Sequence, residues 1–376
     1  MKTVVILGMH RSGTSVVAKA ISLSGVEFGD NLLEAKADNE KGFWEDAYIV
    51  DCNDKVLHQS QHEWYTVGEV NPVFKDKKAD ILQYIEKKFK DFDIWGVKDP
   101  RLCRLLPEWN NILDSVASDI KYCVAIRNPL SVISSLKSRN EFTAKHAELL
   151  WYQYNIDILQ SLTNKEFSVI DFDQLITEPK ASVIRLAKGL SIEYNLLEEE
   201  LEQFCNEFLT ANLRHSSFNF DDLLSDSSIH KDVKDLYKYM LNLTQNEKII
   251  LSKEDVTELI AESELLKEIT SGEKIFNEEF RMCFSLKERL THTEASLNIT
   301  KQHLIKTFQE RDQALNERDI VETRHQMALA RLADLENTKN GINEKLILIQ
   351  SELEKVYNSK SWKLTGCLRN IRKILG

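Results

Sequence analysis

The chain of 376 residues carries 49 Lys and Arg against 60 Asp and Glu, a formal net charge of -11. This balance argues against a general role in binding nucleic acids, and any anionic ligand must be held by a local basic pocket. The six cysteines show neither Cys-x-x-Cys nor Cys/His metal spacing, so we expect reduced, mostly buried thiols and no bound metal. No apolar stretch approaches the ~20 residues that span a bilayer, and the apolar run at the N-terminus predicts a core strand rather than a signal peptide. We therefore expect a cytoplasmic protein.

The first informative segment is the apolar run 3–7, which is followed by the loop Gly8-Met9-His10-Arg11-Ser12-Gly13-Thr14-Ser15 and a helix-like stretch. A glycine-bounded loop between a strand and a helix directs backbone N–H groups and the positive end of a helix dipole at one point, which suits a phosphate. The spacing is that of G-x-x-x-x-G-K-[ST], but Thr14 stands at the lysine position, which argues against ordinary ATP chemistry. The loop is predicted to hold another phosphorylated donor through Arg11, Ser12, Gly13, Thr14 and Ser15.

Residues 10–15 resemble the 5′-phosphosulfate loop of the sulfotransferases, whose donor is 3′-phosphoadenosine 5′-phosphosulfate (PAPS). That family binds the 3′-phosphate of the donor with an arginine at the end of a strand and a serine eight residues later. Here Arg127 follows the predicted strand 122–126, and Ser135 lies eight residues further on. The resemblance therefore implies that Arg127 and Ser135 hold the 3′-phosphate, and a guanidinium is suited to grip a phosphate with two hydrogen bonds.

A third segment, residues 95–102, contains Lys98-Asp99-Pro100 and resembles the K-D-P segment of tyrosylprotein sulfotransferases and bacterial sulfotransferase-like proteins. In those proteins the lysine lies near the bridging oxygen of the donor. The resemblance implies that Lys98 neutralises charge on the leaving phosphate, a stabilisation worth a few kcal/mol. The alternative is a surface salt-bridge cluster of Lys98, Asp99 and Arg101.

Several residues are candidates for the general base that deprotonates the acceptor hydroxyl. Related enzymes carry a glutamate some twenty to thirty-five residues past the donor loop, and Glu45 lies in that interval within Gly42-Phe43-Trp44-Glu45. A carboxylate beside two aromatic residues would lose water, which raises its pKa. We choose Glu45 and expect Glu45, Lys98 and Arg11 to be catalytic. The alternatives are Asp46, His10 or His62, or a Glu45 that is only a solvated loop acid.

Alternating apolar runs predict an α/β domain over residues 1–245, with a P-loop-type parallel sheet flanked by helices on both faces. The predicted strands lie near residues 3–8, 94–98, 121–126 and 167–172, and the predicted helices near 14–24, 78–91, 130–139, 144–163, 179–190 and 195–209.

From 251 to 357 the chain is charged, poor in helix breakers and apolar in a broken heptad that begins with Leu290, Leu297 and Leu304. This pattern predicts a long coiled coil that makes a homo-oligomer, with Arg311, Arg318, Glu322 and His325 on seam positions and a break at Asn340-Gly341. The alternatives are a single solvated helix, or helices that fold back on the α/β domain.

The last 18 residues, 359–376, carry five cations and no carboxylate. An amphipathic helix of this composition suits an anionic membrane surface, and the alternative is a cap on the coil or a peptide that docks on a partner. The segment also resembles tails on enzymes of bacterial surface-polysaccharide assembly.

These patterns together predict a bacterial-type, PAPS-dependent sulfotransferase that acts without a metal at the inner membrane. The expected acceptor is a hydroxyl of a cell-surface glycan or of its lipid-linked precursor. The alternatives are a non-catalytic scaffold of a polysaccharide assembly complex and a nucleotide-dependent P-loop kinase.

Overall fold

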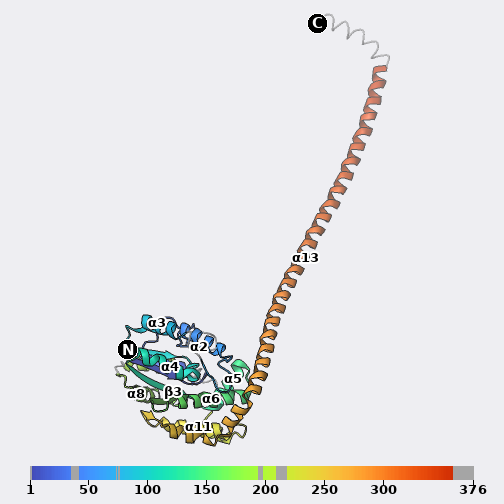
Figure 1. Ribbon diagram of the computed structural model, residues 1–376. Coiled ribbons are helices and arrows are strands. Elements are labelled where there is room, and N and C mark those ends of the chain that lie inside the picture. The colour runs from blue at the N-terminus through green and yellow to red at the C-terminus, as the bar shows by residue number, and fades with distance from the viewer. Residues whose placement is uncertain are drawn as a thin grey trace. The chain divides into compact units, whose positions relative to one another are not determined.

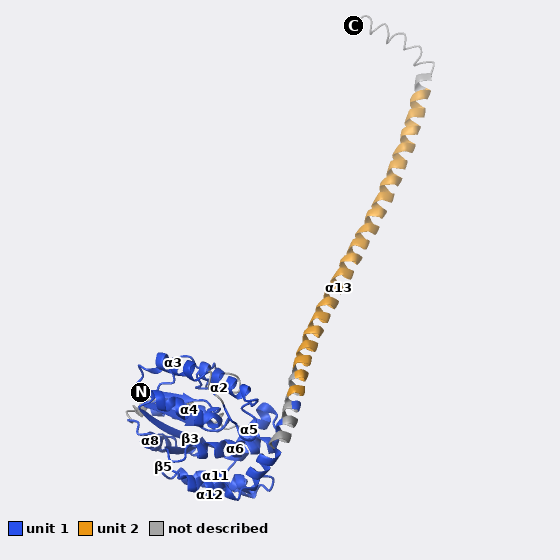
Figure 2. Ribbon diagram, in the orientation of Figure 1, with its two compact units in different colours: residues 1–283 blue, residues 284–376 orange. Residues whose placement is uncertain are grey.

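The computed structural model describes residues 2–34, 42–72, 74, 77–193, 198–208 and 218–358. It divides into two compact units, Met1–Cys283 and Phe284–Gly376 (Figure 2). The first unit has the predicted α/β class, and the described part of the second belongs to a long helix. In the described part of the chain, no helix is apolar over a length that could cross a membrane.

The strands are β1 (Lys2–Leu7), β2 (Ile94–Lys98), β3 (Asp119–Ile126), β4 (Glu166–Asp171) and β5 (Ile249–Ile250). The helices up to residue 189 are α1 (Thr14–Ser22), α2 (Ala47–Gln59), α3 (Lys78–Phe89), α4 (Leu102–Val116), α5 (Pro129–Asn140), α6 (Ala144–Ser161), α7 (Phe172–Thr177) and α8 (Pro179–Gly189). Those that follow are α9 (Glu198–Gln203), the π-helical η1 (Phe204–Phe208), α10 (Phe220–Ser225), α11 (Lys231–Leu243), α12 (Lys253–Ala261) and α13 (Glu264–Asn358).

The five strands form one sheet in the order β2-β1-β3-β4-β5. Figure 1 labels β3, the middle strand of this sheet. The first four are parallel, and Val5 of β1 lies opposite Val97 of β2 and Tyr122 of β3. The predicted parallel sheet flanked by helices is confirmed, and a short fifth strand, β5, pairs antiparallel with β4. The chain leaves β1 for one side of the sheet and returns for β3 on the other, and open α/β sheets bind ligands at such a switch point.

Both faces of the sheet are buried, and the side chains of β1 alternate between two cores. Val5 and Leu7 pack in a core that includes residues of α4 and α6. Val4 and Ile6 pack in a second core with residues of α1 and α8. This burial explains why the strand is continuously apolar rather than alternating, and it fixes the loop that follows β1 to a rigid edge.

The first compact unit continues beyond residue 245. Leu265 and Ile269, in the first turns of α13, are buried in the core that also holds α11 and α12. Further along α13, the Asn277 side chain accepts from the Val67 backbone N–H at 3.1 Å and donates to the Val67 carbonyl at 2.8 Å. The α/β core is therefore completed by residues from the first part of the stretch 251–357.

Helix α13 continues through Asn340 and Gly341, so the predicted break there was wrong. A single glycine costs a helix about 1 kcal/mol relative to alanine, and the strong helix formers on both sides outweigh that cost. The predicted tail, 359–376, lies outside the described residues.

Candidate active site

The loop Gly8–Ser15 connects the carboxyl end of β1 to α1, whose amino-terminal cap is Gly13. Gly13 has φ 83°, and a Cβ atom there would lie 2.1 Å from the Phe172 ring. A Cβ on Gly8 would lie 2.5 Å from the Ala125 carbonyl oxygen of β3. Both glycines are thus required by the close approach of neighbouring elements. Arg11 also has φ 70°, an uncommon conformation for a residue other than glycine that often marks functional sites.

The two segments predicted to hold the donor meet at this loop. The Arg11 Nε donates to Ser135 Oγ at 2.8 Å, and the Arg127 Nη1 donates to the Arg11 carbonyl at 3.1 Å. Arg127 is only 6% exposed, and its guanidinium lies 4.3 Å from the centre of the Phe172 ring. The Arg127 carbonyl accepts from the Trp151 indole at 3.2 Å, which fixes the turn after β3 to α6. The structure therefore brings Arg11, Arg127 and Ser135 together on the β3 side of the loop.

Lys98 reaches the same loop from β2. Its Nζ donates to Glu45 Oε1 at 2.6 Å, to the Phe43 carbonyl at 2.8 Å and to Ser15 Oγ at 3.2 Å. Lys98 is 3% exposed and Glu45 is 6% exposed. The pKa of Glu45 is raised from its ordinary value because burial disfavours the charged carboxylate, although the ammonium of Lys98 works against that shift. Glu45, the predicted base, and Lys98, the cation predicted to act on the leaving group, thus form a buried, hydrogen-bonded pair.

A network of buried polar residues supports this pair. Asp99 accepts from Arg101 Nη1 at 2.9 Å and from Asn53 Nδ2 at 2.8 Å, and Asn53 accepts from the Trp109 indole at 2.8 Å. Arg101 also approaches Glu45, with 3.9 Å between Nη1 and Oε2. Asp99 is fully buried, so the alternative of a surface salt-bridge cluster at Lys98, Asp99 and Arg101 was wrong. Arg101 belongs to the site, and its place beside the K-D-P segment was the available signal.

Two of the alternative bases, Asp46 and His62, have side chains that are engaged in hydrogen bonds near α2. Asp46 caps α2, with its Oδ1 accepting from the Tyr48 and Ile49 N–H groups at 3.0 Å. Its Oδ2 accepts from the Tyr84 hydroxyl at 2.8 Å. His62 lies in the turn after α2, with Nδ1 2.5 Å from the Ser60 carbonyl.

His10 has a different environment from the other two. Its ring lies 4.3 Å from the Trp64 ring and 6.1 Å from the Tyr154 ring. Its Nε2 is buried with no hydrogen-bond partner among the described residues. Burial and then the nearby cations, Arg101 and Lys98 first, hold the pKa of His10 well below 6.5, so its imidazole is neutral at pH 7. Because this environment disfavours the protonated imidazole, His10 is a weaker proton acceptor than an exposed histidine. The contribution of the loop at Trp64 could not be seen in the sequence.

The solved structures that are similar to this chain include two sulfotransferase domains. A sulfotransferase domain from the Synechococcus PCC 7002 olefin synthase gives a TM-score of 0.35 at 14% identity, over 69% of this chain and 94% of that chain. A sulfotransferase domain from the curacin biosynthetic pathway gives 0.36 at 17% identity, over 69% and 95%. No family model matches the chain, and no curated protein matches it. At this level of similarity, the function has to follow from the site residues themselves.

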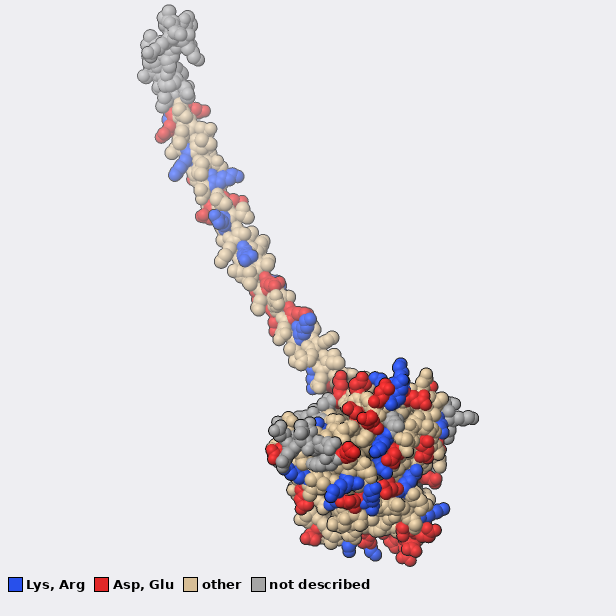
Figure 3. Space-filling model, turned by 90° about the vertical axis from the view of Figure 1, so that its left-hand side faces the viewer, with Lys and Arg blue, Asp and Glu red and all other residues tan. Residues whose placement is uncertain are grey.

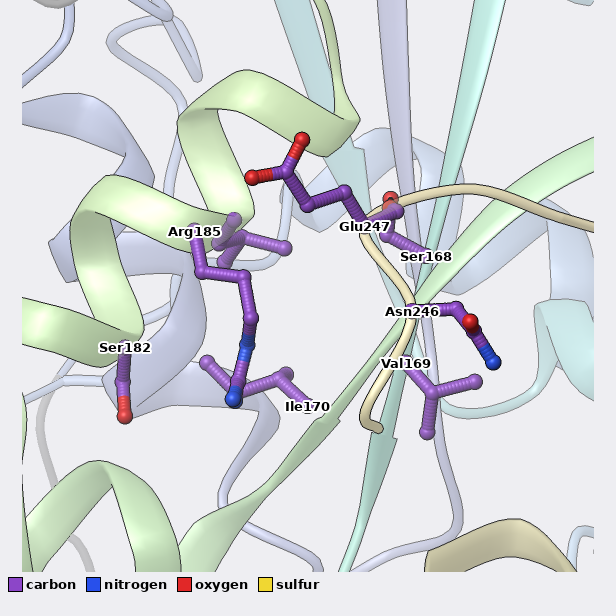
Figure 4. Close-up of a pocket in the computed structure, with 8 residues that line it drawn as sticks. Ser168, Val169, Ile170, Ser182, Arg185, Asn246 and Glu247 are labelled. Carbon is purple, nitrogen blue, oxygen red and sulfur yellow. Dashed lines mark hydrogen bonds between the residues drawn. The ribbon is translucent and has the colours of Figure 1, made fainter. Parts of the chain in front are cut away.

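A small pocket away from this site lies beside β4, between α8 and the turn after α11, and Figure 4 shows its lining. Its polar side chains are engaged: Ser168 Oγ donates to the Glu247 carbonyl at 2.7 Å, and Arg185 Nη2 donates to Gln174 Oε1 at 2.9 Å. We assign it no role. Across the described ranges, no group of three His, Cys, Asp or Glu side chains is placed to hold a metal ion.

Proposed function

We propose that this protein is a sulfotransferase that uses PAPS as its donor. One observation carries the proposal: cations from the two strands that flank β1 both reach the β1 loop, through Lys98 to Ser15 and Arg127 to the Arg11 carbonyl. Charged groups at two points of one loop suit a donor with phosphate at both ends. The buried Ser12 and Thr14 and the glycine-bounded turn offer the small groups that a 5′-phosphosulfate needs.

In this proposal each side of the loop has a separate role. Arg127 and Ser135 hold the 3′-phosphate, while Arg11 and residues 12–15 hold the 5′-phosphosulfate. Lys98 neutralises the oxygen that is released when the donor S–O bond breaks. Glu45 accepts the proton of the acceptor hydroxyl as the new S–O bond forms, so the products are a sulfate ester and adenosine 3′,5′-bisphosphate.

The kinase alternative is disfavoured by two features. Thr14 stands where a nucleotide-binding loop has lysine. Asp99, the acid that follows β2, is engaged on both oxygens by Arg101 and Asn53, which leaves it poorly suited to hold Mg²⁺.

The acceptor that we propose is a hydroxyl of a cell-surface glycan or its lipid-linked precursor, met at the cytoplasmic face of the inner membrane. The support is the five cations of residues 359–376 and the resemblance of that segment to tails of polysaccharide-assembly enzymes. Deletion of residues 359–376 should release the full-length protein from anionic liposomes in a sedimentation assay. Continued sedimentation of the truncated protein would refute the membrane role of this segment.

The donor is tested with the full-length chain by calorimetry against adenosine 3′,5′-bisphosphate and ATP. We expect the bisphosphate to bind far more tightly, because only it has a 3′-phosphate for Arg127. Equal affinity would refute the donor assignment. Tight bisphosphate binding without transfer of labelled sulfate from PAPS to any glycolipid fraction would favour the scaffold alternative.

A further inference from the structure

The proposed reaction gives no role to the second compact unit, where α13 carries a regular stripe of apolar side chains. We number this stripe as a heptad with Leu290 at position a and Thr293 at position d. Position a holds Leu290, Leu297, Leu304, Arg311, Arg318, His325, Leu332, Lys339, Leu346 and Leu353. Position d holds Thr293, Thr300, Thr307, Ala314, Val321, Ala328, Leu335, Ile342, Ile349 and Val356.

The large apolar side chains of the stripe are half exposed or more in the single chain. The a-position leucines are 47% to 58% exposed, and Val321, Leu335, Ile342 and Ile349 are 53% to 63% exposed. The stripe runs for about 100 Å at 1.5 Å per residue, and Figure 3 shows uncharged side chains between charges of both signs along the helix. An apolar stripe of this length is not a stable solvated surface, and its seven-residue period is that of a left-handed supercoil.

We propose that a second copy of this chain covers the stripe, in a parallel, in-register, two-stranded coiled coil from Leu290 to Val356. The arrangement of charge on this segment favours another copy of the chain as the partner. This inference does not depend on the proposed reaction.

The charged residues beside the seam match those of an identical, aligned helix. In a parallel coil, a side chain at position a packs next to the partner's residue at the preceding position g. Glu310 and Glu317 occupy those g positions before Arg311 and Arg318. In the single chain, the two arginines form ion pairs with the exposed aspartates that follow them, Asp312 at 2.7 Å and Asp319 at 3.5 Å, and Arg311 also lies 5.1 Å from the centre of the Phe308 ring. Such exposed contacts contribute little, so a second copy offers the arginines better partners.

Flanking positions add two complementary pairs between aligned copies and one like-charged pair, because Glu317 at g faces Glu322 at e of the partner. Arg289 at g faces position e of the partner five residues later, where Glu294 stands, and Arg331 faces Glu336 in the same way. An identical partner thus supplies a complementary pair on each side of the polar block, the segment from Glu310 to His325.

The distribution of polar layers favours the parallel orientation. The d positions of the first three heptads are Thr293, Thr300 and Thr307, whereas the later ones are Leu335, Ile342 and Ile349. Parallel alignment stacks each layer on itself and keeps the apolar layers intact. Antiparallel alignment would place the threonines against the apolar end and interrupt its continuous apolar layers, although each threonine hydroxyl keeps its hydrogen bond to the backbone carbonyl four residues earlier.

Two features of the seam favour different numbers of helical strands in the coiled coil. Leucine at a with isoleucine at d, as at Leu346 and Ile349, favours more than two strands. The cations at Arg311, Arg318 and Lys339 favour two, because the seam of a dimer leaves long side chains a route to water. Each added strand would bury another set of these charges, so the desolvation cost decides for a dimer.

The seam is tested by the mass of the full-length chain in light scattering, with 43.5 kDa expected for a monomer. We expect wild type at twice that mass. Leu297→Asp with Leu346→Asp, both at position a, should give monomers. The matched control is Ile299→Asp with Leu348→Asp, which puts the same charges two residues away at position c and should remain dimeric. A monomeric wild type, a trimer or tetramer, or equal masses for both pairs of substitutions would overturn the proposal.

Orientation and register are tested by oxidation of introduced cysteines. Thr300→Cys at position d lies beside its own copy only in the parallel, in-register arrangement, and Asn298→Cys at position b does not. Greater cross-linking of Thr300→Cys than of Asn298→Cys and wild type is expected. Equal cross-linking would refute that arrangement.

Charge recognition is tested by reversing the charge at the a positions or at the g positions. Arg311→Glu with Arg318→Glu makes both kinds of position acidic, and Glu310→Arg with Glu317→Arg makes both basic. Each variant alone should dimerise more weakly than wild type, and the mixture should form heterodimers at low salt. No preference for the heterodimer would overturn the role given to these charges.

Discussion

The two sides of the donor loop are stabilised in different ways. On the β3 side, the cations Arg11 and Arg127 are oriented by a hydroxyl, a backbone carbonyl and the Phe172 ring. These contacts orient a guanidinium without cancelling its charge. On the β2 side, Lys98 donates to the carboxylate of Glu45. The first arrangement suits the binding of an anion, and the second suits the exchange of a proton.

This difference predicts that substitutions on the two sides fail in different assays. Changes on the β2 side should reduce turnover, while changes on the β3 side should reduce donor affinity. The predictions below test that separation, from the largest expected effect to the smallest.

The largest effect is expected for Glu45→Gln, which keeps the size of the side chain and removes the base. Turnover should fall by about 10²- to 10⁴-fold, the usual contribution of a general base, while bisphosphate affinity stays within a few-fold of wild type. The measurements are sulfate transfer from PAPS and calorimetry on the same samples. His10→Gln is the companion variant, and loss of turnover there but not in Glu45→Gln would move the base to His10.

Arg127→Ala should weaken adenosine 3′,5′-bisphosphate by roughly 1.5 to 3 kcal/mol, the range for hydrogen bonds to a charged group. The affinity for 5′-AMP should hardly change, because that ligand lacks the 3′-phosphate. Calorimetry with both ligands checks this, and an equal loss for the two would contradict the role given to Arg127.

A third prediction concerns Asp171, which ends β4 beside Phe172. Burial, the largest cause, raises the pKa of its carboxyl to about 6. Between the unfolded value near 3.9 and this folded value, only the folded chain holds the proton. The free energy of unfolding should therefore fall as pH rises from 4 to 6, by up to about 1.4 kcal/mol per pH unit from this group.

Asp171→Asn removes this titration and keeps the size of the side chain. Urea unfolding at intervals from pH 4 to 7 should show a shallower dependence on pH for the variant than for wild type. Parallel curves for the two proteins would exclude Asp171 as the source.

The smallest effect is expected for Asp46→Ala, one residue after the proposed base. Loss of the α2 cap should lower the free energy of unfolding by about 1 kcal/mol, as cap removal usually does. Turnover per folded molecule should stay within a few-fold of wild type. A loss as large as that in Glu45→Gln would assign the proton to Asp46 instead.

Local sequence patterns were enough to predict the first, second, third and fourth strands and the loop that follows β1. They missed α2, α4, α7, α10 and α11, and they missed β5 because two residues are too short a pattern. For α4, Pro100 and Pro107 interrupt the helical signal, yet Pro107 lies inside the helix. The start of α2 did have a signal, since Asp46 precedes the apolar stretch at a typical cap spacing.

The contacts of the site could not be predicted from spacing because they depend on non-local pairing. Lys98 reaches Ser15 since β2 lies beside β1 with Lys98 opposite Ile6. Its pairing with Glu45 further requires the segment before α2 to cross the same edge. The environment of His10 likewise depends on Trp64 and Tyr154, which come from two distant segments.

The contacts made by the first turns of α13 limit where the coding sequence can be divided. These contacts are the buried side chains of Leu265 and Ile269 and the two hydrogen bonds between Asn277 and Val67. A coding segment (cassette) that ended near residue 245, where composition changes, would encode a unit without Leu265 and Ile269. The core residues that these two side chains cover would then be exposed to solvent. A cassette that ends at Cys283, the last residue of the first compact unit, retains these contacts. Recombination between the first compact unit and other C-terminal segments should therefore succeed only when the crossover falls within α13 rather than ahead of it.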